Sequence, residues 1–144
     1  MELSVREKTV NELKLPKKID WKKLAWDTLS LLVRTEANYE CEFHKKIQEK
    51  NLVSPCVCNG VMQCCHKITR KKLSIKFDRR NNLCGCSGSN AWAHNNELAW
   101  DKLWRQLYPE DIEFLEMRVN RIVHFKNWDY KIMIDEYKKK LEEL

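Results

Sequence analysis

Cysteine is the residue type in this chain with the clearest chemical potential, and six of the seven cysteines fall between residues 55 and 90. Four of them form two Cys-x-Cys pairs, Cys56/Cys58 and Cys84/Cys86. Zinc bound by thiolates takes four tetrahedral ligands, commonly delivered as pairs from two turns. The two pairs therefore predict a structural zinc site. The alternative is that these cysteines are buried free thiols that pack as small apolar groups.

A second pair of zinc donors occurs earlier in the chain. Cys41 and His44, in CEFH, have the two-residue spacing more usual for zinc ligands, so they are an alternative to one of the Cys-x-Cys pairs. The cysteine count is odd, and the N-terminus MELSVREKTV has no apolar signal core. We therefore expect an intracellular protein whose cysteines bind metal rather than form disulfides.

A histidine lies between the two Cys-x-Cys pairs. His66 ends the sequence QCCH, and an imidazole has an unperturbed pKa close to neutral, so in its neutral form it can take a proton from water. A lone histidine is more often structural, but Asn81, Asn90 and His94 follow in the same segment. This grouping indicates a general base in a polar site.

The segment that follows His66 is strongly basic. Against a single aspartate it contains seven cationic side chains: Lys67, Arg70, Lys71, Lys72, Lys76, Arg79 and Arg80. Cations clustered in this way neutralise phosphates and release counterions, and the net charge of +6 agrees with a polyanionic partner. We expect DNA contacts here, with a solvated charged turn as the alternative.

The elements that would position these groups are mainly helical. Glycine and proline are scarce, at three each, and apolar residues recur at helical spacing from Asp20 to about Arg34 and again after residue 96. Asp20 and either Asn95 or Asn96 are suitable N-caps, and Pro109 suits a first helical turn. Further helices are predicted over 38–50 and 128–144, and strands over 61–68 and 73–77.

The predicted fold class is α+β and mostly helical, with a metal-bound ββα centre flanked by helices. Residues 1–19 are predicted to be a polar, basic N-terminal arm. Residues 20–144 would form one domain, helical over 20–50 and 97–144, with the metal-bound centre at 55–96. No stretch approaches the length of apolar sequence that a membrane span requires, so no membrane partner is expected.

Four sequence segments within 63–96 carry a resemblance to a known family. They are QCCHKITR (63–70), IKFDRRN (75–81), CGCSGSN (84–90) and WAHNN (92–96). In this order they resemble the ββα-metal, or HNH, endonucleases, and most of all the phage branch of NinG/Rap-like recombination proteins. In that family a strand ends in a histidine, a motif like RFDxxN follows, and a Cys-x-x-Cys turn opens a helix.

The resemblance implies roles for particular residues. His66 matches the general base that activates water, and Asn81 matches the asparagine that ties the loop and orients that histidine. Asn90 matches a ligand of the catalytic divalent cation (Mg, Mn, Ni or Zn), and His94 a further ligand or phosphate contact. Cys65 stands where many members carry an aspartate or histidine metal ligand.

The function implied is that of a metal-dependent DNA endonuclease or junction-processing recombination protein, with His66 as general base. The DNA partner could be branched or single-stranded. The protein would act in the cytoplasm of a bacterial host and be encoded by a phage or prophage. It could also form a homodimer. Cys65 and Ser89, which stands where a zinc thiolate is usual, motivate an alternative. This is a zinc-stabilised nucleic-acid-binding or adaptor protein with an inactive HNH scaffold.

Overall fold

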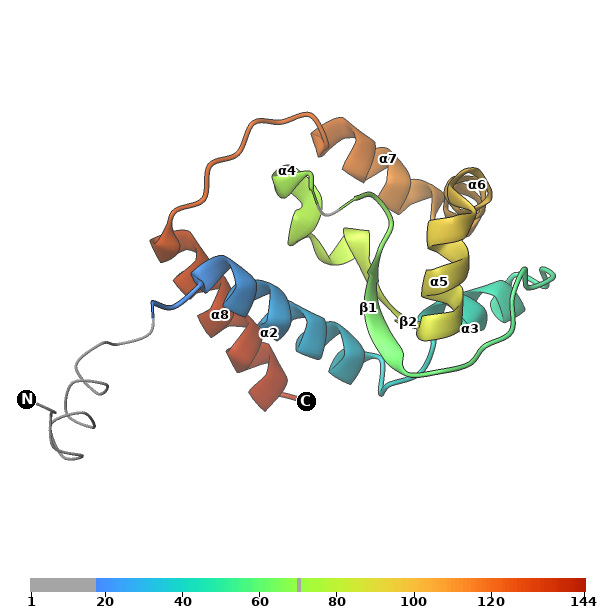
Figure 1. Cartoon of the computed structure of the whole chain (residues 1–144), viewed down its shortest axis with the longest axis horizontal. Helices are drawn as coiled ribbons and strands as arrows, with labels where there is room; N and C mark the ends of the chain where they lie inside the picture. Colours follow the sequence, from blue (N-terminus) through green and yellow to red (C-terminus); the bar gives the residue numbers. More distant parts are fainter. Residues whose placement is uncertain (1–17, 70) are drawn as a thin grey trace, which may run out of the picture.

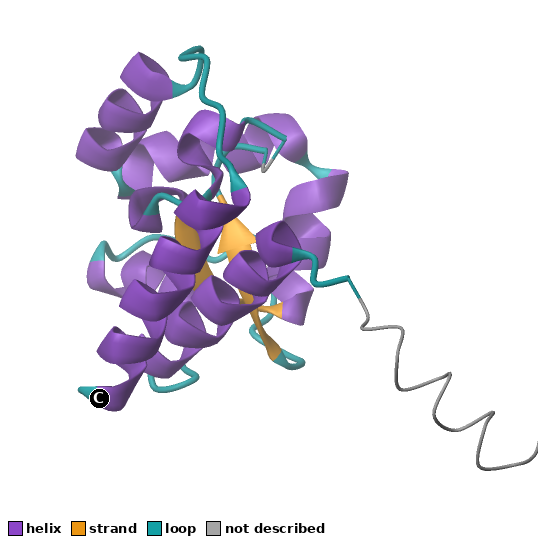
Figure 2. Ribbon diagram, turned by 90° about the vertical axis from the view of Figure 1, so that its left-hand side faces the viewer, coloured by secondary structure: helices purple, strands orange, loops and turns teal. Residues whose placement is uncertain are grey.

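The computed structural model describes residues 18–69 and 71–144, and within them the fold is α+β and mostly helical, as predicted. Figure 1 shows an antiparallel pair of strands at the centre, with helices α2 and α8 on one side and α5, α6 and α7 on the other. In Figure 2 the strands lie enclosed between helices. The predicted N-terminal arm falls almost entirely on residues 1–17, outside the described residues.

Helices α2 (Trp21–Glu36) and α8 (Asn127–Glu142) lie side by side and form one wall of the core. The predicted N-cap of α2 is confirmed, because the Asp20 carboxylate accepts a hydrogen bond from the Lys23 amide at 3.0 Å. Not every apolar residue of α2 is buried. Leu24 and Leu31 are 38% and 40% exposed, whereas the buried face is centred one position further on. Its members are Ala25, Thr28, Leu29, Leu32 and Val33.

A ββα succession occupies the middle of the chain. Strands β1 (Met62–His66) and β2 (Asn82–Cys86) pair antiparallel, with His66 opposite Asn82 and Met62 opposite Cys86. Helix α5 (Ser87–Asn95) starts directly after β2, without a connecting loop. His66 therefore lies at one end of the sheet and Cys86 at the other.

The predicted second strand, over 73–77, is wrong. Those residues form a short helix, α4 (Leu73–Lys76), followed by the 3-10 helix η1 (Arg79–Asn81). The Asn82 side chain donates to the carbonyls of Lys76 and Asp78 at 2.9 and 2.7 Å, which holds the segment in a turn. The segment LSIKF alternates apolar and polar residues, which is the pattern of a half-buried strand, and this alternation led to the wrong prediction. In β2 every residue is buried, so the true strand has no alternation.

The remaining helices build a second apolar core around aromatic rings. They are α3 (Glu42–Glu49), α6 (Glu97–Leu107) and α7 (Pro109–Arg118). Pro109 opens α7 as predicted, and Asn96, one of the two predicted N-caps, occupies the N-cap position of α6, although its side chain makes no capping hydrogen bond. Helix α7 ends at Arg118, and Ile122, which follows it, is 87% exposed. No helix of the described residues has the length and apolarity to cross a membrane.

Candidate metal centre and the His66 cavity

Four side chains from separate parts of the chain converge on one point. The ligand atoms of Cys41, His44, Cys58 and Cys86 all lie within 4.8 Å of one another. The His44 Nδ1 atom is 3.1 Å from Cys41 Sγ and 3.8 Å from Cys86 Sγ. Three sulfurs and one imidazole nitrogen are a donor set typical of structural zinc. The cluster could therefore hold a metal ion such as zinc.

Each ligand is placed by the end of a secondary-structure element. Cys41 is the N-cap of α3, and His44 lies in the first turn of that helix. Cys86 ends β2 and is also the N-cap of α5. Two helix N-termini thus face the cluster, and the positive end of a helix attracts negatively charged groups.

Cys58 is delivered by a loop that docks on the first turn of α5. The Ser87 amide donates to the Val61 carbonyl at 2.8 Å, and the Gly88 amide donates to the Asn59 carbonyl at 3.2 Å. Gly60 has a positive φ of 82°, and a Cβ atom there would collide with the Ser87 hydroxyl. This close approach of two backbones brings Cys58 beside Cys86.

The sulfur atoms are held by amide donors. Cys86 Sγ accepts from the Ser89 amide at 3.3 Å, and Cys41 Sγ accepts from the Cys86 amide at the same distance. Burial raises the pKa of Cys86, but the hydrogen bonds from Ser89 outweigh it and bring the value down to about 7. Burial and the negative charge of Cys41 and Cys86 raise the pKa of Cys58 to about 12. A dication between the three sulfurs would remove that repulsion.

The histidine in the cluster is already oriented for a metal. His44 Nε2 lies 3.1 Å from the Cys56 carbonyl oxygen, and a carbonyl can only accept, so Nε2 carries the proton. The lone pair of the ring is then on Nδ1, the nitrogen that faces the sulfurs. A carbonyl that fixes the tautomer in this way is typical of histidine ligands.

The structure brings together only part of the predicted zinc quartet. Cys58 and Cys86 lie in the cluster, together with the alternative pair Cys41 and His44. The sulfur of Cys56 lies 3.8 Å from His44 Nε2, whereas Cys41 Sγ and Cys86 Sγ lie near Nδ1, and Cys56 is not a member of the cluster. Cys84 is fully buried in the apolar core with side chains of α2 and α8. Each Cys-x-Cys pair therefore contributes one cysteine to the cluster.

His66 lines a separate cavity of about 420 Å³ at the other end of the sheet. His94 of α5 lines the same cavity, and the two imidazole ring centroids are 6.3 Å apart. Lys67, Thr69, Glu97 and Asp101 complete the polar part of its wall. The predicted general base and one predicted partner thus share one polar cavity.

Asn81 clamps the chain immediately after His66. Its side chain is fully buried, accepts from the Ile68 amide at 2.8 Å and donates to the Ile68 carbonyl at 3.0 Å. Its own carbonyl accepts from the Lys67 amide at 2.8 Å. One asparagine therefore fixes both residues that follow His66.

We expect Asn81→Ala to lower the free energy of unfolding by about 2–4 kcal/mol, because two buried backbone groups of Ile68 lose their partners. Urea unfolding followed by circular dichroism measures this. Asn95→Ala is the control, since the Asn95 amide donates to Ala91 on the exposed surface of α5, and it should change stability by about 0.5 kcal/mol or less. Equal losses of unfolding free energy in the two variants would contradict the claim that the Asn81 side chain stabilises the backbone of Ile68.

The other predicted ligands of a catalytic cation lie elsewhere. Asn90 Nδ2 donates to the Gln63 side chain at 2.9 Å, and Asn90 is not among the described residues that line the His66 cavity. Cys65 is 2% exposed, and burial raises the pKa of its thiol far above the usual range. A neutral buried thiol is a poor ligand for magnesium. Within the described part of the chain, the four-residue cluster is the one group of three or more His, Cys, Asp or Glu ligands.

The first basic residue of the predicted nucleic-acid contact is buried. The Lys67 side chain is 3% exposed and pairs with Asp111 of α7 at 2.9 Å. Its ammonium lies 4.6 and 4.0 Å from the ring centroids of Trp104 and Tyr108. Lys67 therefore joins β1 to the helices behind it and is not available to a phosphate.

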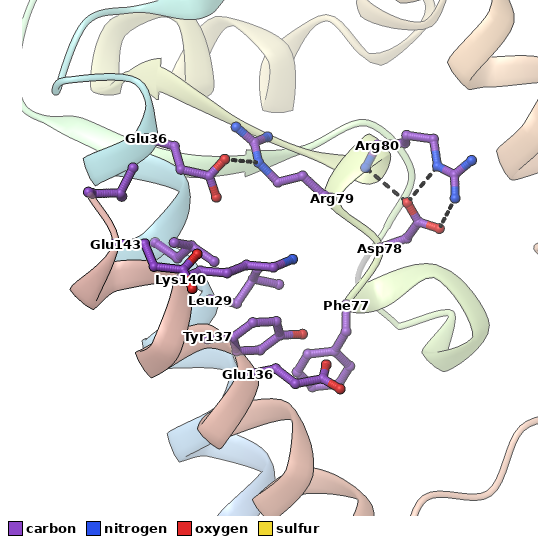
Figure 3. Close-up of a pocket in the computed structure, with 12 residues that line it drawn as sticks. Leu29, Glu36, Phe77, Asp78, Arg79, Arg80, Glu136, Tyr137, Lys140 and Glu143 are labelled. Carbon is purple, nitrogen blue, oxygen red and sulfur yellow. Dashed lines mark hydrogen bonds and ion pairs between the residues drawn. The ribbon is translucent and has the colours of Figure 1, made fainter.

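Most of the other basic side chains also have partners. Lys76 lies over the Phe77 ring, Arg79 is 3.2 Å from the Glu42 carboxylate, and Arg80 pairs with Asp78 at 3.1 Å. Figure 3 shows both arginines tied to carboxylates at the edge of a cavity of about 670 Å³ between α2, α8 and residues 77–80. Arg70 lies outside the described residues. Lys71 and Lys72 are exposed and form no ion pair with any described residue.

No protein-family model matches the chain, and no curated protein and no solved structure is similar to it.

Proposed function

We propose that this chain is an HNH-type, metal-dependent DNA endonuclease whose ββα element is stabilised by a zinc ion at Cys41, His44, Cys58 and Cys86. The observation that carries the proposal is the pairing of His66 with His94 in one polar cavity, with Asn81 clamping the backbone beside it. This supports the roles implied by the family resemblance at those three positions.

In the proposed reaction His66 acts on water. Its imidazole accepts a proton from the water molecule as the oxygen attacks phosphorus, and the bond from phosphorus to the leaving sugar oxygen breaks. A divalent cation, when bound, would stabilise the charge on the phosphate and on the leaving oxygen. In this proposal His94 binds the phosphate or that cation. Asn81 holds the backbone so that the His66 ring stays directed at the cavity.

The test is incubation of the zinc-loaded protein with plasmid, single-stranded and branched DNA in the presence of magnesium, manganese or nickel. Nicked or linear products with at least one cation support the proposal. Absence of cleavage of all three substrates with every cation would refute the enzymatic function.

A second candidate function rests on Cys65 and Asn90. Cys65 is buried and Asn90 is bonded to Gln63, so neither is placed to hold a catalytic cation. This favours a zinc-stabilised DNA-binding or adaptor protein that has kept the scaffold and lost cleavage. Such a protein would bind DNA in the cleavage assay without producing any new ends.

Either function requires contact with phosphates, and among the residues that the structure describes Lys71 and Lys72 are the exposed cations nearest to His66 in sequence. We expect the double substitution Lys71→Glu/Lys72→Glu to weaken DNA binding by about 1–3 kcal/mol and to reduce the salt slope of log K by about 2, since two phosphate contacts are lost. Fluorescence anisotropy at several salt concentrations measures both quantities.

The matched control is Lys138→Glu/Lys139→Glu, which makes the same charge change at two adjacent exposed lysines of α8. It alters the net charge equally but should leave most of the affinity and the salt slope in place. If the two double variants bind alike, only the overall charge matters and the segment after His66 faces empty solvent.

A further inference from the structure

We infer that Cys64 and Cys84 form a redox-active pair that closes reversibly to a disulfide across the sheet. The two cysteines are directly opposite each other in adjacent antiparallel strands, Cys64 in β1 and Cys84 in β2. Neither belongs to the four-residue metal cluster, so both stay free thiols whether or not that cluster is filled.

The hydrogen-bond pattern of the sheet gives the separation of the pair. The Lys67 amide donates to the Asn81 carbonyl, and the Ser87 amide donates to the Val61 carbonyl. Bonded and non-bonded pairs alternate along an antiparallel ladder, and Cys64/Cys84 is three positions from each of these bonded pairs. It is therefore a non-hydrogen-bonded pair, whose Cα atoms are about 4.5 Å apart. A disulfide needs about 4.4–6.8 Å.

The surroundings of the pair favour this disulfide over other pairings. Cys84 is fully buried and Cys64 is half-buried, and both pack against Leu29, Leu32 and Val33 of α2. Cys65, the immediate neighbour of Cys64, packs in the other apolar core, on the side of Phe43 and Trp100. The side chains of Cys64 and Cys84 therefore meet each other on one face, and Cys65 is directed away from both.

The oxidant we propose is a low-molecular-weight disulfide such as oxidised glutathione. The Cys64 sulfur, the less buried of the two, attacks one sulfur of the reagent, and the reagent's S–S bond breaks to release one thiol. The Cys84 sulfur then attacks Cys64 in this mixed disulfide and releases the second thiol. The two thiol protons of the protein end on the two reduced reagent molecules, so the pair loses two electrons and the reagent gains them.

The disulfide should also be easy to reverse. Directly opposed Cβ atoms in a sheet are about 4.5–5.5 Å apart, whereas a disulfide holds them at about 3.5–4.5 Å. Closing the bond therefore draws the strands together, and a strained disulfide is readily reduced. The bond would lie between the Cys86 end and the His66 end of the sheet, where it holds the register of the element that carries both sites.

The test is treatment of the zinc-loaded, full-length protein with oxidised glutathione, then alkylation of the remaining thiols, proteolysis and mass spectrometry. We expect a cross-linked peptide pair that joins residues 51–67 to 81–102 in wild type and in Cys65→Ala. The cross-link should be absent from Cys64→Ser and Cys84→Ala and should disappear with dithiothreitol. Zinc content, measured in the same samples, should not fall as the cross-link forms.

Three results would overturn the inference. They are the absence of any cross-link in wild type, a cross-link that persists in Cys64→Ser, and a cross-link that forms only as zinc is released. Cys64 is only half-buried, so Cys64→Ser should still fold. This variant therefore tests the inference even if Cys84→Ala fails to fold. These results are independent of DNA cleavage, so the inference and the proposed function can fail separately.

Discussion

Changing Cys58 to serine will strip the protein of its metal, whereas the same change at Cys56, two residues earlier, will leave the metal in place. The reason is geometric, since Cys58 Sγ belongs to the cluster of four ligand atoms, whereas Cys56 Sγ lies outside the cluster and contacts His44 Nε2. Zinc per chain, measured by inductively coupled plasma mass spectrometry after dialysis against a chelator, should be about one for wild type and Cys56→Ser. It should be close to zero for Cys58→Ser.

Stability should follow the metal. Binding of a structural zinc contributes on the order of 10 kcal/mol in small domains, comparable to the whole free energy of unfolding of a typical domain. Cys58→Ser should therefore lose its cooperative unfolding transition or shift it by tens of degrees. Cys56→Ser should melt within a few degrees of wild type. Equal zinc content in the two variants would show that the cluster is not the metal centre.

We expect removal of the imidazole of His66 to abolish the proposed DNA cleavage and to leave the proposed DNA binding intact. A positioned general base contributes about 10²–10⁴-fold to the rate, so His66→Ala should lower the single-turnover rate constant by at least two orders of magnitude. DNA affinity and zinc content should stay near wild type, because His66 lies outside the metal cluster, at the opposite end of the sheet from Cys86.

His124→Ala is the matched control for this experiment. His124 is an exposed histidine in the connection between α7 and α8, and the variant should cleave at the wild-type rate. If His66→Ala cleaves as fast as His124→Ala, then His66 is not the base. If wild type and both variants bind DNA alike and none cleaves it, the adaptor function stands.

Most helices could be predicted because their signals are local. Asp20 marks the start of α2 through its side chain and Pro109 that of α7 through its ring, and Asn96 occupies the N-cap position of α6. Strand β2 could not be predicted in this way. It is buried on both faces, so it lacks alternation, and the alternating segment just before it is held in a turn by Asn82.

The residue types of the metal cluster could be predicted, but not which cysteine of each pair belongs to it. The choice of Cys58 over Cys56 depends on how the loop at Gly60 docks on α5, and the choice of Cys86 over Cys84 on where β2 gives way to that helix. The sequence Asn59-Gly60 is a turn signal. It could have indicated that Cys58, the residue just before the turn, is the cysteine that reaches the metal cluster. The buried ion pair of Lys67 joins residues 44 positions apart, and no local pattern reveals such a partner.

X-ray absorption at the zinc edge is the most direct test of the central claim, that one metal ion joins Cys41, His44, Cys58 and Cys86. The cluster predicts a first shell of three sulfur atoms at about 2.3 Å and one nitrogen at about 2.0 Å. The nitrogen and its imidazole scattering should vanish in His44→Ala. A shell of four sulfur atoms in the wild-type protein would mean that the two Cys-x-Cys pairs bind the metal together, and it would contradict the assignment of His44 as a ligand.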